Sequence, residues 1–217
     1  MGNRKLVVST GNKHKILEIR EILEGLNIEV LSKNDIGFEG FDIVEDGETL
    51  EDNSIKKAKA LSDKTDYIVI ADDTGLFVDY LNGAPGVHSA NYGGGDHDYN
   101  GNNERLLKEL DGVPLDKRQA YFETVIAIVL EDKSIRTVSG RCNGIISLKP
   151  SGNMGFGYDP LFIPEGYDKS FGELGLDLKN KISHRSRALE KLKLEINNIL
   201  EDDANEDICN KWYPWQY

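Results

Sequence analysis

The chain is poor in cysteine, which limits both its covalent chemistry and its compartment. Cys142 and Cys209 are its two cysteines among 217 residues, too few for a disulfide framework or a four-cysteine zinc site. Six prolines exclude a proline-rich stalk. No apolar run approaches the ~18 residues that a membrane-spanning helix requires. We therefore expect a cytoplasmic protein in a reducing environment, with no membrane partner.

Basic residues are also scarce. Lys and Arg number 26 against 38 Asp and Glu, and the formal net charge is -12. Bulk attraction cannot hold such a chain on nucleic acid or on an anionic membrane, so we expect no nucleic-acid partner and exclude an RNA-binding module. The exception is residues 179–193, with six Lys and Arg against one Glu. A local patch of this size suits a small polyanion.

Alternating apolar patterns predict an α/β protein. Strands are expected at residues 4–9, 28–31, 67–71, 76–80, 120–130 and 134–146, and helices at 13–24, 49–61, 104–110 and 183–200. This order predicts a mixed sheet with flanking helices. The loops at 82–103 and 149–159 are long enough to indicate functional or disordered segments. The tail, residues 201–217, is either a frayed end or an aromatic plug on the protein's own surface or on a partner.

The first candidate site is the turn between the first strand and the first helix. A helix start offers free N–H groups and a positive dipole end, both of which favour an anion. The P-loop pattern is absent, and a capped helix start with solvated lysines stays open as an alternative. The candidate phosphate contacts in this turn are Thr10, Gly11, Asn12, Lys13, His14 and Lys15.

Acidic residues form the second candidate. Asp72 and Asp73 directly follow the predicted strand at 67–71, and burying them is costly without a cation. Mg²⁺ prefers carboxylate oxygens and often bridges to phosphates. A plain Asp-Asp-Thr-Gly turn is the alternative. Another acidic cluster, Glu45, Asp46 and Glu48, precedes the second helix, where such residues also suit a helix N-terminus.

Two later segments suit the base and phosphates of a nucleotide. Glycines in residues 155–159 let the backbone approach a ligand, and Phe156 and Tyr158 offer flat faces. Aromatic faces stack nucleic-acid bases with about 1–3 kcal/mol each. A tight turn with one buried aromatic, and a solvated helix face for the basic patch, are the alternatives. Together, the four segments describe a nucleoside triphosphate site.

At these residues the chain resembles the inosine/xanthosine triphosphate pyrophosphatase family. Six motifs occur in the family's order: Thr10-Gly11-Asn12-x-x-Lys15, Thr49-x-x-x-Asn53-x-x-x-Lys57-Ala58, Ala71-Asp72-Asp73-Thr74-Gly75-Leu76, Gly83-Ala84-Pro85-Gly86-Val87-x-Ser89-Ala90, Gly155-Phe156-Gly157-Tyr158-Asp159-Pro160 and Ser183-His184-Arg185. The resemblance implies an elongated α/β fold (Maf/ITPase-like) with a mixed sheet. It implies one domain, residues 1–200, with two lobes around a central nucleotide cleft.

The resemblance also implies an activity. Family members hydrolyse non-standard purine nucleoside triphosphates (ITP, dITP and XTP) to the monophosphate and pyrophosphate, which cleans the nucleotide pool. They are usually Mg²⁺-dependent homodimers. Position by position, Lys15 and its turn match the triphosphate site, Asp73 the general base and metal ligand, and Thr74 a substrate contact. Glu45 matches the second metal ligand, with Asp46 or Glu48 as alternatives. The remaining nucleotide-binding positions are Phe156, Gly157, Tyr158, Asp159, Lys179, His184 and Arg185.

Selectivity is expected from the 6-keto edge of the base, where donors from His184 or Arg185 would pair with O6. Two other functions remain as alternatives. A pyrophosphatase for modified pyrimidine triphosphates is disfavoured by the Ser183-His184-Arg185 motif. A nucleotide sensor without hydrolysis would lack a metal carboxylate, whereas Glu45, Asp72 and Asp73 are all present.

Overall fold

A computed structural model describes residues 4–95 and 98–212 of the chain, without the side chains of His14 and of residues 202–212. The aromatic end of the tail, residues 213–217, lies outside the described residues, as does the proposed phosphate contact of the His14 side chain. None of the described helices combines the length and the apolarity needed to cross a bilayer.

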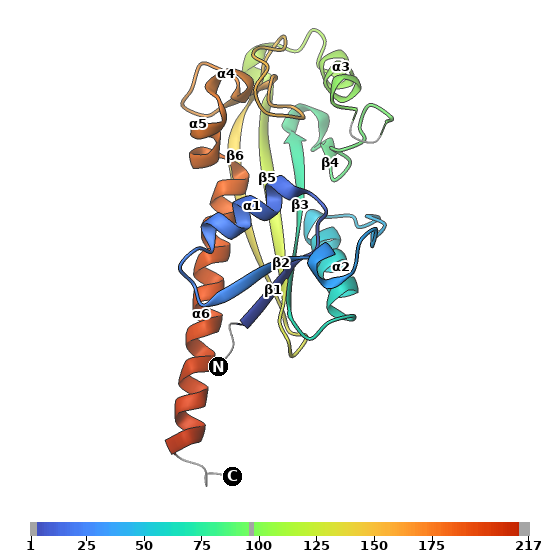
Figure 1. The fold of residues 1–217 in the computed structure, drawn as a ribbon. Coiled ribbons are helices and arrows are strands. Elements are labelled where there is room, and N and C mark those ends of the chain that lie inside the picture. The colour runs from blue at the N-terminus through green and yellow to red at the C-terminus, as the bar shows by residue number, and fades with distance from the viewer. Residues whose placement is uncertain (1–3, 96–97, 213–217) are drawn as a thin grey trace.

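A seven-stranded mixed sheet forms the frame of the molecule (Figure 1). Its strands are β1 (Arg4–Val8), β2 (Ile28–Ser32), β3 (Ile68–Val78), β4 (Pro85–Gly86), β5 (Gln119–Val129), β6 (Ile135–Ile146) and β7 (Phe162–Pro164). Their order is β2-β1-β3-β5-β6-β7, with β4 paired to β3. β1 pairs in parallel with β2 and β3, and the other pairs are antiparallel. The predicted mixed sheet is confirmed.

Helices flank the sheet. They are α1 (Lys13–Ile22), α2 (Leu50–Ser62), α3 (Tyr99–Glu109), α4 (Phe171–Leu174), α5 (Leu176–Ile182) and α6 (His184–Trp212), with short 3₁₀ turns η1 (Asn34–Ile36), η2 (Asp79–Leu81) and η3 (Leu115–Lys117). α3, α4 and α5 lie at one end of the long strands, while α1, α2 and most of α6 lie towards the other (Figure 1).

The two faces of the sheet are covered by different helices. Because side chains alternate along a strand, Leu6 and Val8 of β1 join a cluster with residues of α1 and α6. Val7 faces the other way and joins Ala58 and Leu61 of α2. A third cluster lies further along β3, β5 and β6, beneath α3 and α4. The long strands therefore connect the first two clusters, on opposite faces of one end of the sheet, with the third cluster at the other end.

The structure corrects several predicted boundaries. The strands predicted at 67–71 and 76–80 are one strand, β3, so the Asp-Asp-Thr-Gly segment is not a turn. The helix predicted at 104–110 begins at Tyr99, inside the predicted loop. The last helix continues past residue 200 to Trp212. β7, α4 and α5 were not predicted, because short elements carry too few residues to show a period.

Candidate active site

The two adjacent aspartates of β3 point to opposite faces of the sheet. Asp72 pairs in register with Ile126 of β5, and Asp73 pairs with Val125. Within a continuous strand, neighbouring side chains alternate between faces. Asp72 therefore joins the side covered by α1 and α6, and Asp73 the side covered by α2. The two adjacent carboxylates therefore have different neighbours.

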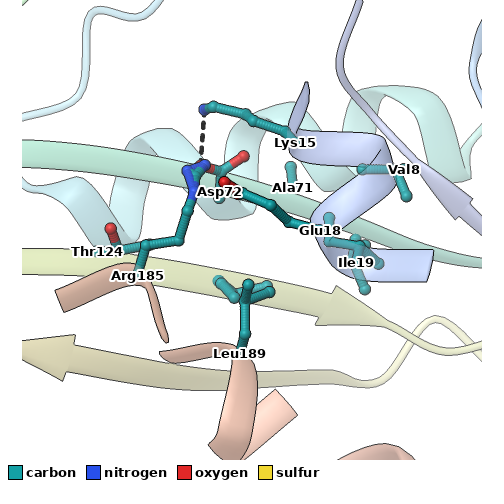
Figure 2. Close-up of a pocket in the computed structure, with 11 residues that line it drawn as sticks. Val8, Lys15, Glu18, Ile19, Ala71, Asp72, Thr124, Arg185 and Leu189 are labelled. Carbon is teal, nitrogen blue, oxygen red and sulfur yellow. Dashed lines mark hydrogen bonds and ion pairs between the residues drawn. The ribbon is translucent and has the colours of Figure 1, made fainter. Parts of the chain in front are cut away.

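Asp72 is buried between two cations from different helices (Figure 2). Lys15 of α1 donates to Asp72 Oδ2 at 2.7 Å, and Arg185 of α6 donates to the same oxygen at 2.6 Å. Arg185 Nε also donates to Glu18 of α1 at 3.0 Å. Burial alone would raise the pKa of Asp72, but the charges of Lys15 and Arg185 outweigh it and hold that pKa well below its usual range.

The Lys15 ammonium is partly buried beside the Asp72 carboxylate, and this burial changes its pKa. Burial lowers the pKa of Lys15, and the Asp72 carboxylate opposes that shift only in part. A cavity of about 10 Å³ lies under this network, with the charged groups on one side and Val8, Ile19, Ile70, Ile126 and Leu189 on the other. That is room for about one water molecule. The counterions thus fill the space over Asp72.

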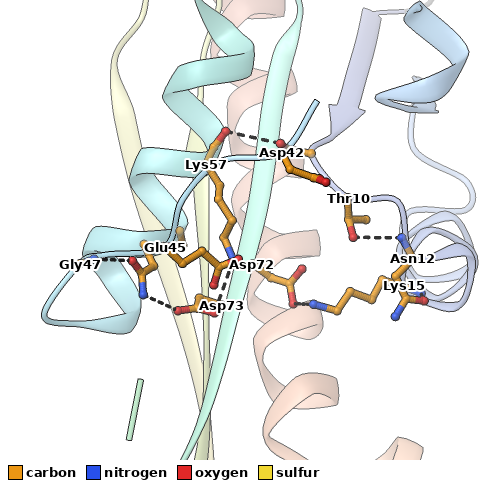
Figure 3. A network of polar contacts seen from close by, with 12 residues as sticks. Thr10, Asn12, Lys15, Asp42, Glu45, Gly47, Lys57, Asp72 and Asp73 are labelled. Atoms are coloured by element: carbon orange, nitrogen blue, oxygen red, sulfur yellow. Dashed lines mark hydrogen bonds and ion pairs between the residues drawn. The ribbon is translucent and has the colours of Figure 1, made fainter. Parts of the chain in front are cut away.

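Asp73 lies in a second cluster, on the α2 side of the sheet (Figure 3). Asn53 Nδ2 donates to Asp73 Oδ2 at 3.1 Å. Lys57 Nζ lies 3.4 Å from Asp73 Oδ1 and 3.1 Å from Glu45 Oε1. Burial raises the pKa of Asp73, Lys57 opposes the rise, and the negative charge of Glu45 adds to it. Glu45 and Asp73 therefore meet with one lysine between them.

Asn53 and Lys57 are site residues that the sequence reasoning missed. They lie four residues apart on α2, a spacing that places both on one helical face. Thr49 caps this helix by accepting a hydrogen bond from the Asp52 N–H at 3.0 Å. Both residues stand in the motif Thr49-x-x-x-Asn53-x-x-x-Lys57-Ala58, and their spacing of four is the signal that assigns them to one face of the helix. Asp46 instead forms an ion pair with Lys56 on the surface, away from Asp73.

The turn before α1 connects a strand to a helix, as the sequence predicts, and its side chains cap that helix. Thr10 Oγ1 accepts from the Asn12 N–H at 3.2 Å, and Asn12 Oδ1 accepts from the Lys15 N–H at 3.4 Å. Gly11, Asn12 and Lys13 are exposed. The side chain of Asn12 thus caps α1, while the turn and Lys15 lie beside Asp72 in Figure 3. Thr74, two residues further along β3, shares a 2.8 Å hydrogen bond with Thr124 of β5.

Only one of the two predicted stacking rings is exposed. Phe156 is 62% exposed, and Lys179 Nζ lies 4.4 Å from the centre of its ring. Tyr158 is 4% exposed, and its hydroxyl donates to the Ser89 carbonyl at 2.9 Å. The prediction of Tyr158 as a stacking face is therefore wrong, because its ring belongs to the hydrophobic cluster beneath α3.

Asp159 organises the Phe156 loop from the inside. Its Oδ2 accepts from the Phe156 N–H at 2.8 Å and from Lys179 Nζ at 2.5 Å. Burial raises the pKa of Asp159, although Lys179 opposes that shift. Since the residue is 2% exposed, its carboxylate is almost completely buried. The prediction of Asp159 as a direct nucleotide contact is replaced by a role in holding Phe156 and Lys179.

Replacing Asp159 by Asn should destabilise the protein. The change leaves the Lys179 ammonium without its buried counterion, and breaking a buried ion pair costs about 3–5 kcal/mol. At about 2–4 °C per kcal/mol for a protein of this size, Tm should fall by roughly 6–20 °C. Calorimetry beside Asp168→Asn, an exposed site, provides the comparison. Equal Tm values for the two variants would contradict the assignment.

His184 begins α6 in a buried position. Its ring stacks on Phe122 with centroids 4.7 Å apart, and its Nδ1 is buried with no hydrogen-bond partner among the described residues. Burial lowers the pKa of His184 well below its usual value, and the nearby Arg185 and Lys179 charges lower it further.

A Cβ on Gly140 of β6 would lie 2.1 Å from the His184 carbonyl oxygen. Glycine at that position therefore lets the start of α6 pack against the sheet.

The acidic groups fit a hard divalent cation with few protein ligands. In the described part of the chain, no three His, Cys, Asp or Glu side chains lie close enough to hold a metal ion. Glu45 and Asp73 nevertheless converge on one lysine, and the pKa of Asp73 stays raised because burial and Glu45 leave its charge incompletely compensated. Mg²⁺ commonly binds one or two carboxylates and completes its octahedron with water and phosphate. The residues present fit that arrangement.

These features define a class of protein. A central strand of the sheet carries the carboxylates, and the turn before α1 lies beside them (Figure 3). The exposed Phe156 ring with Lys179 over it is the third feature. An α/β protein of this build has a site for a phosphate-bearing nucleotide.

The comparisons name the family: the chain belongs to the Ham1 family, whose model matches residues 6–195. A dITP/XTP pyrophosphatase of Thermoanaerobacter pseudethanolicus is 48% identical over 91% of this chain and 99% of its own length. The solved Ham1 protein of Coxiella burnetii has a TM-score of 0.84 at 34% identity, covering 90% of this chain and 99% of its own. A nucleoside-triphosphatase / dITP/XTP pyrophosphatase of Mycobacterium abscessus has a TM-score of 0.76 at 38% identity, covering 87% and 98%.

Proposed function

We propose that this protein is an enzyme that hydrolyses non-standard purine nucleoside triphosphates such as ITP, dITP and XTP to the monophosphate and pyrophosphate. The observation that carries the proposal is the Asp73–Lys57–Glu45 cluster. It occurs in a chain that matches 99% of the length of a dITP/XTP pyrophosphatase. Hydrolysis of the bond between the α- and β-phosphates removes the nucleotide from the triphosphate pool that polymerases use.

The chemistry follows from charge and alignment more than from covalent help. Asp73 orients a water molecule and takes its proton as the water oxygen bonds to the α-phosphorus. The bond between that phosphorus and the bridging oxygen breaks, and pyrophosphate leaves. Lys15 and the turn of residues 10–13 hold the leaving group. Lys57 lies at the same carboxylates and offsets charge on the phosphate oxygens.

Glu45 and Asp73 would hold the Mg²⁺ ion. When bound, it would neutralise phosphate charge and lower the pKa of a coordinated water. Away from the phosphates, the purine base of the substrate would lie on the Phe156 ring, with Lys179 beside it. His184 offers a buried Nδ1 without a partner among the described groups, and Arg185 offers further donors. Either residue could pair with O6 of hypoxanthine or xanthine.

We also propose the wider setting. Strands β3, β5 and β6 connect the hydrophobic regions at both ends of the sheet. This supports one two-lobed domain over residues 1–200, with the nucleotide cleft between the lobes and residues 201–217 as a tail. A homodimer is proposed from the family resemblance and a cytoplasmic location from the low cysteine content, and sedimentation equilibrium tests the dimer.

The product test separates the candidate functions. Purified protein with Mg²⁺ should convert ITP and XTP to the monophosphate and pyrophosphate, with no diphosphate or orthophosphate, and EDTA should stop the reaction. Product chromatography and a pyrophosphate assay on ITP, dITP, XTP, ATP, GTP and CTP measure this. No hydrolysis with ITP still bound would favour the sensor, and preference for a pyrimidine triphosphate would favour the related enzyme.

A further inference from the structure

Helix α3 touches the Phe156 loop at a position that the proposed chemistry does not use. Asn103 of α3 donates from Nδ2 to the Gly157 carbonyl at 3.0 Å. Gly157 follows Phe156 directly and has a φ of +63°, a left-handed backbone that favours glycine. The ring of Tyr99, one turn earlier on α3, lies 6.2 Å from the Phe156 ring. The exposed ring is therefore supported from the α3 side.

The Asn103 amide has a partner among the described residues at one end only. Its Oδ1 is buried and has no hydrogen-bond partner in the part of the chain that the structure describes. A buried acceptor without a partner is destabilising. The contact with Gly157 is thus kept although the amide is only half satisfied, which is the kind of local conflict expected where a fold serves a function.

The neighbouring residue has a separate task. Asn102 is 1% exposed and donates from Nδ2 to the carbonyls of Ser89 and Ala90 at 3.3 and 3.0 Å. It also accepts from the Gly93 N–H. Asn102 therefore secures the long loop before α3, whereas Asn103 reaches across to the Phe156 loop. Two adjacent side chains of one helix hold two different loops.

From the opposite side, the Phe156 loop is held by Asp159, which binds the Phe156 N–H and Lys179. The contacts of Asp159 fix the start of the loop, and the contact of Asn103 fixes the carbonyl one residue later. The peptide that carries the Phe156 ring is thus held at both ends. Phe156 itself is 62% exposed, so its orientation depends on these backbone contacts together with its contacts to the Tyr99 ring and Lys179 Nζ.

We propose that Asn103 is a positioning residue for substrate binding: it acts through Phe156, by fixing the peptide that orients this ring against the purine base. The inference rests on the proposed function, since it requires Phe156 to stack on the base. Asn103 makes no contact with the reacting phosphates in this account. Its loss should therefore weaken substrate binding and leave the chemical step unchanged.

The test is a double-mutant cycle on ITP hydrolysis. Asn103→Asp removes the donor and places a carboxylate oxygen against the Gly157 carbonyl. It should raise KM for ITP about tenfold, as expected for loss of a hydrogen bond with repulsion in its place, while kcat stays within about twofold. Phe156→Ala should raise KM as well. In the Phe156→Ala background, Asn103→Asp should change KM by less than about twofold, because both act through one ring.

Two further variants separate positioning from folding. Asn103→Leu keeps the side-chain size without introducing a charge and should raise KM less than Asn103→Asp does. Asn100→Asp, an exposed site on the same helix, is the matched control and should leave KM and kcat unchanged. Melting curves on all variants report the fraction folded.

The outcomes are distinct. Multiplicative effects of Asn103→Asp and Phe156→Ala on KM would overturn the proposal, as would a fall in kcat with KM unchanged. An unchanged KM in Phe156→Ala would also overturn it, because no ring contact would then exist to position. By contrast, a wild-type protein that releases no pyrophosphate from any purine triphosphate would overturn the proposed function itself.

Discussion

Asp73→Asn should lower kcat for ITP hydrolysis by about 10³-fold, within the range that a general base contributes. The amide has the shape of the carboxylate and keeps an acceptor for Asn53, which donates to Asp73 in the wild-type protein. It loses the charge that takes a proton from water and that, with Glu45, would hold the metal ion. Steady-state pyrophosphate release measures the loss.

Binding should survive this substitution. The phosphate turn and Lys15 lie on the α1 side of the strand and Asp73 on the α2 side, so calorimetric titration of Asp73→Asn with ITP should give a Kd within about tenfold of the wild-type KM. Asp79→Asn, exposed just beyond the end of β3, is the control and should retain full turnover. Turnover of Asp73→Asn within tenfold of wild type would show that Asp73 is not the base.

The second large effect concerns recognition of the purine ring of the substrate. We expect kcat/KM for ITP to exceed that for ATP by about 10⁴-fold, because a site that pairs donors with O6 leaves those donors unpaired against the amino group of adenine. Arg185→Gln should lower kcat/KM for ITP and narrow this ratio at least tenfold. Parallel kinetics on ITP and ATP for the wild type and the variant measure both quantities.

The control for this prediction lies on the same helix. Arg187 donates to the Arg141 carbonyl at 2.6 Å on the outer side of β6, so Arg187→Gln should keep the wild-type ratio. In Arg185→Gln, Asp72 still has Lys15 as a counterion, which limits the disturbance of β3. Equal kcat/KM for ITP and ATP in the wild-type protein would disprove the assignment of selectivity to the 6-keto edge.

Strand β3 shows which features could be predicted from the sequence and which could not. Its apolar residues correctly predicted a buried strand near residues 67–71 and carboxylates associated with it. The sequence did not indicate that the strand continues through Asp72 and Asp73 to Val78, because Asp and Gly are depleted in strands and favoured in turns. Here the cations of three helices stabilise the carboxylates, and those cations lie far away in the sequence.

In the Phe156 loop, too, the sequence could not predict which aromatic side chain is exposed. Two rings two positions apart looked equivalent as stacking faces. Only the packing against residues 82–95, where the Ser89 carbonyl accepts from the Tyr158 hydroxyl, decides that Tyr158 is buried and Phe156 exposed. No local pattern carries that information, since the two residues in contact are separated by 69 positions.

By itself, the sequence determined the mixed α/β class, the β5–β6 hairpin, the strand–turn–helix order before α1 and the family, because periodicity, turn chemistry and ordered motifs are local properties of the chain. Only the tertiary structure decided that Asp72 faces Lys15 and Arg185 while Asp73 faces Asn53 and Lys57, and that Asn103 reaches the Phe156 loop. The reason is physical. Side-chain direction within a strand is set by register, and the partners of a buried charge are set by which helices cover each face of the sheet.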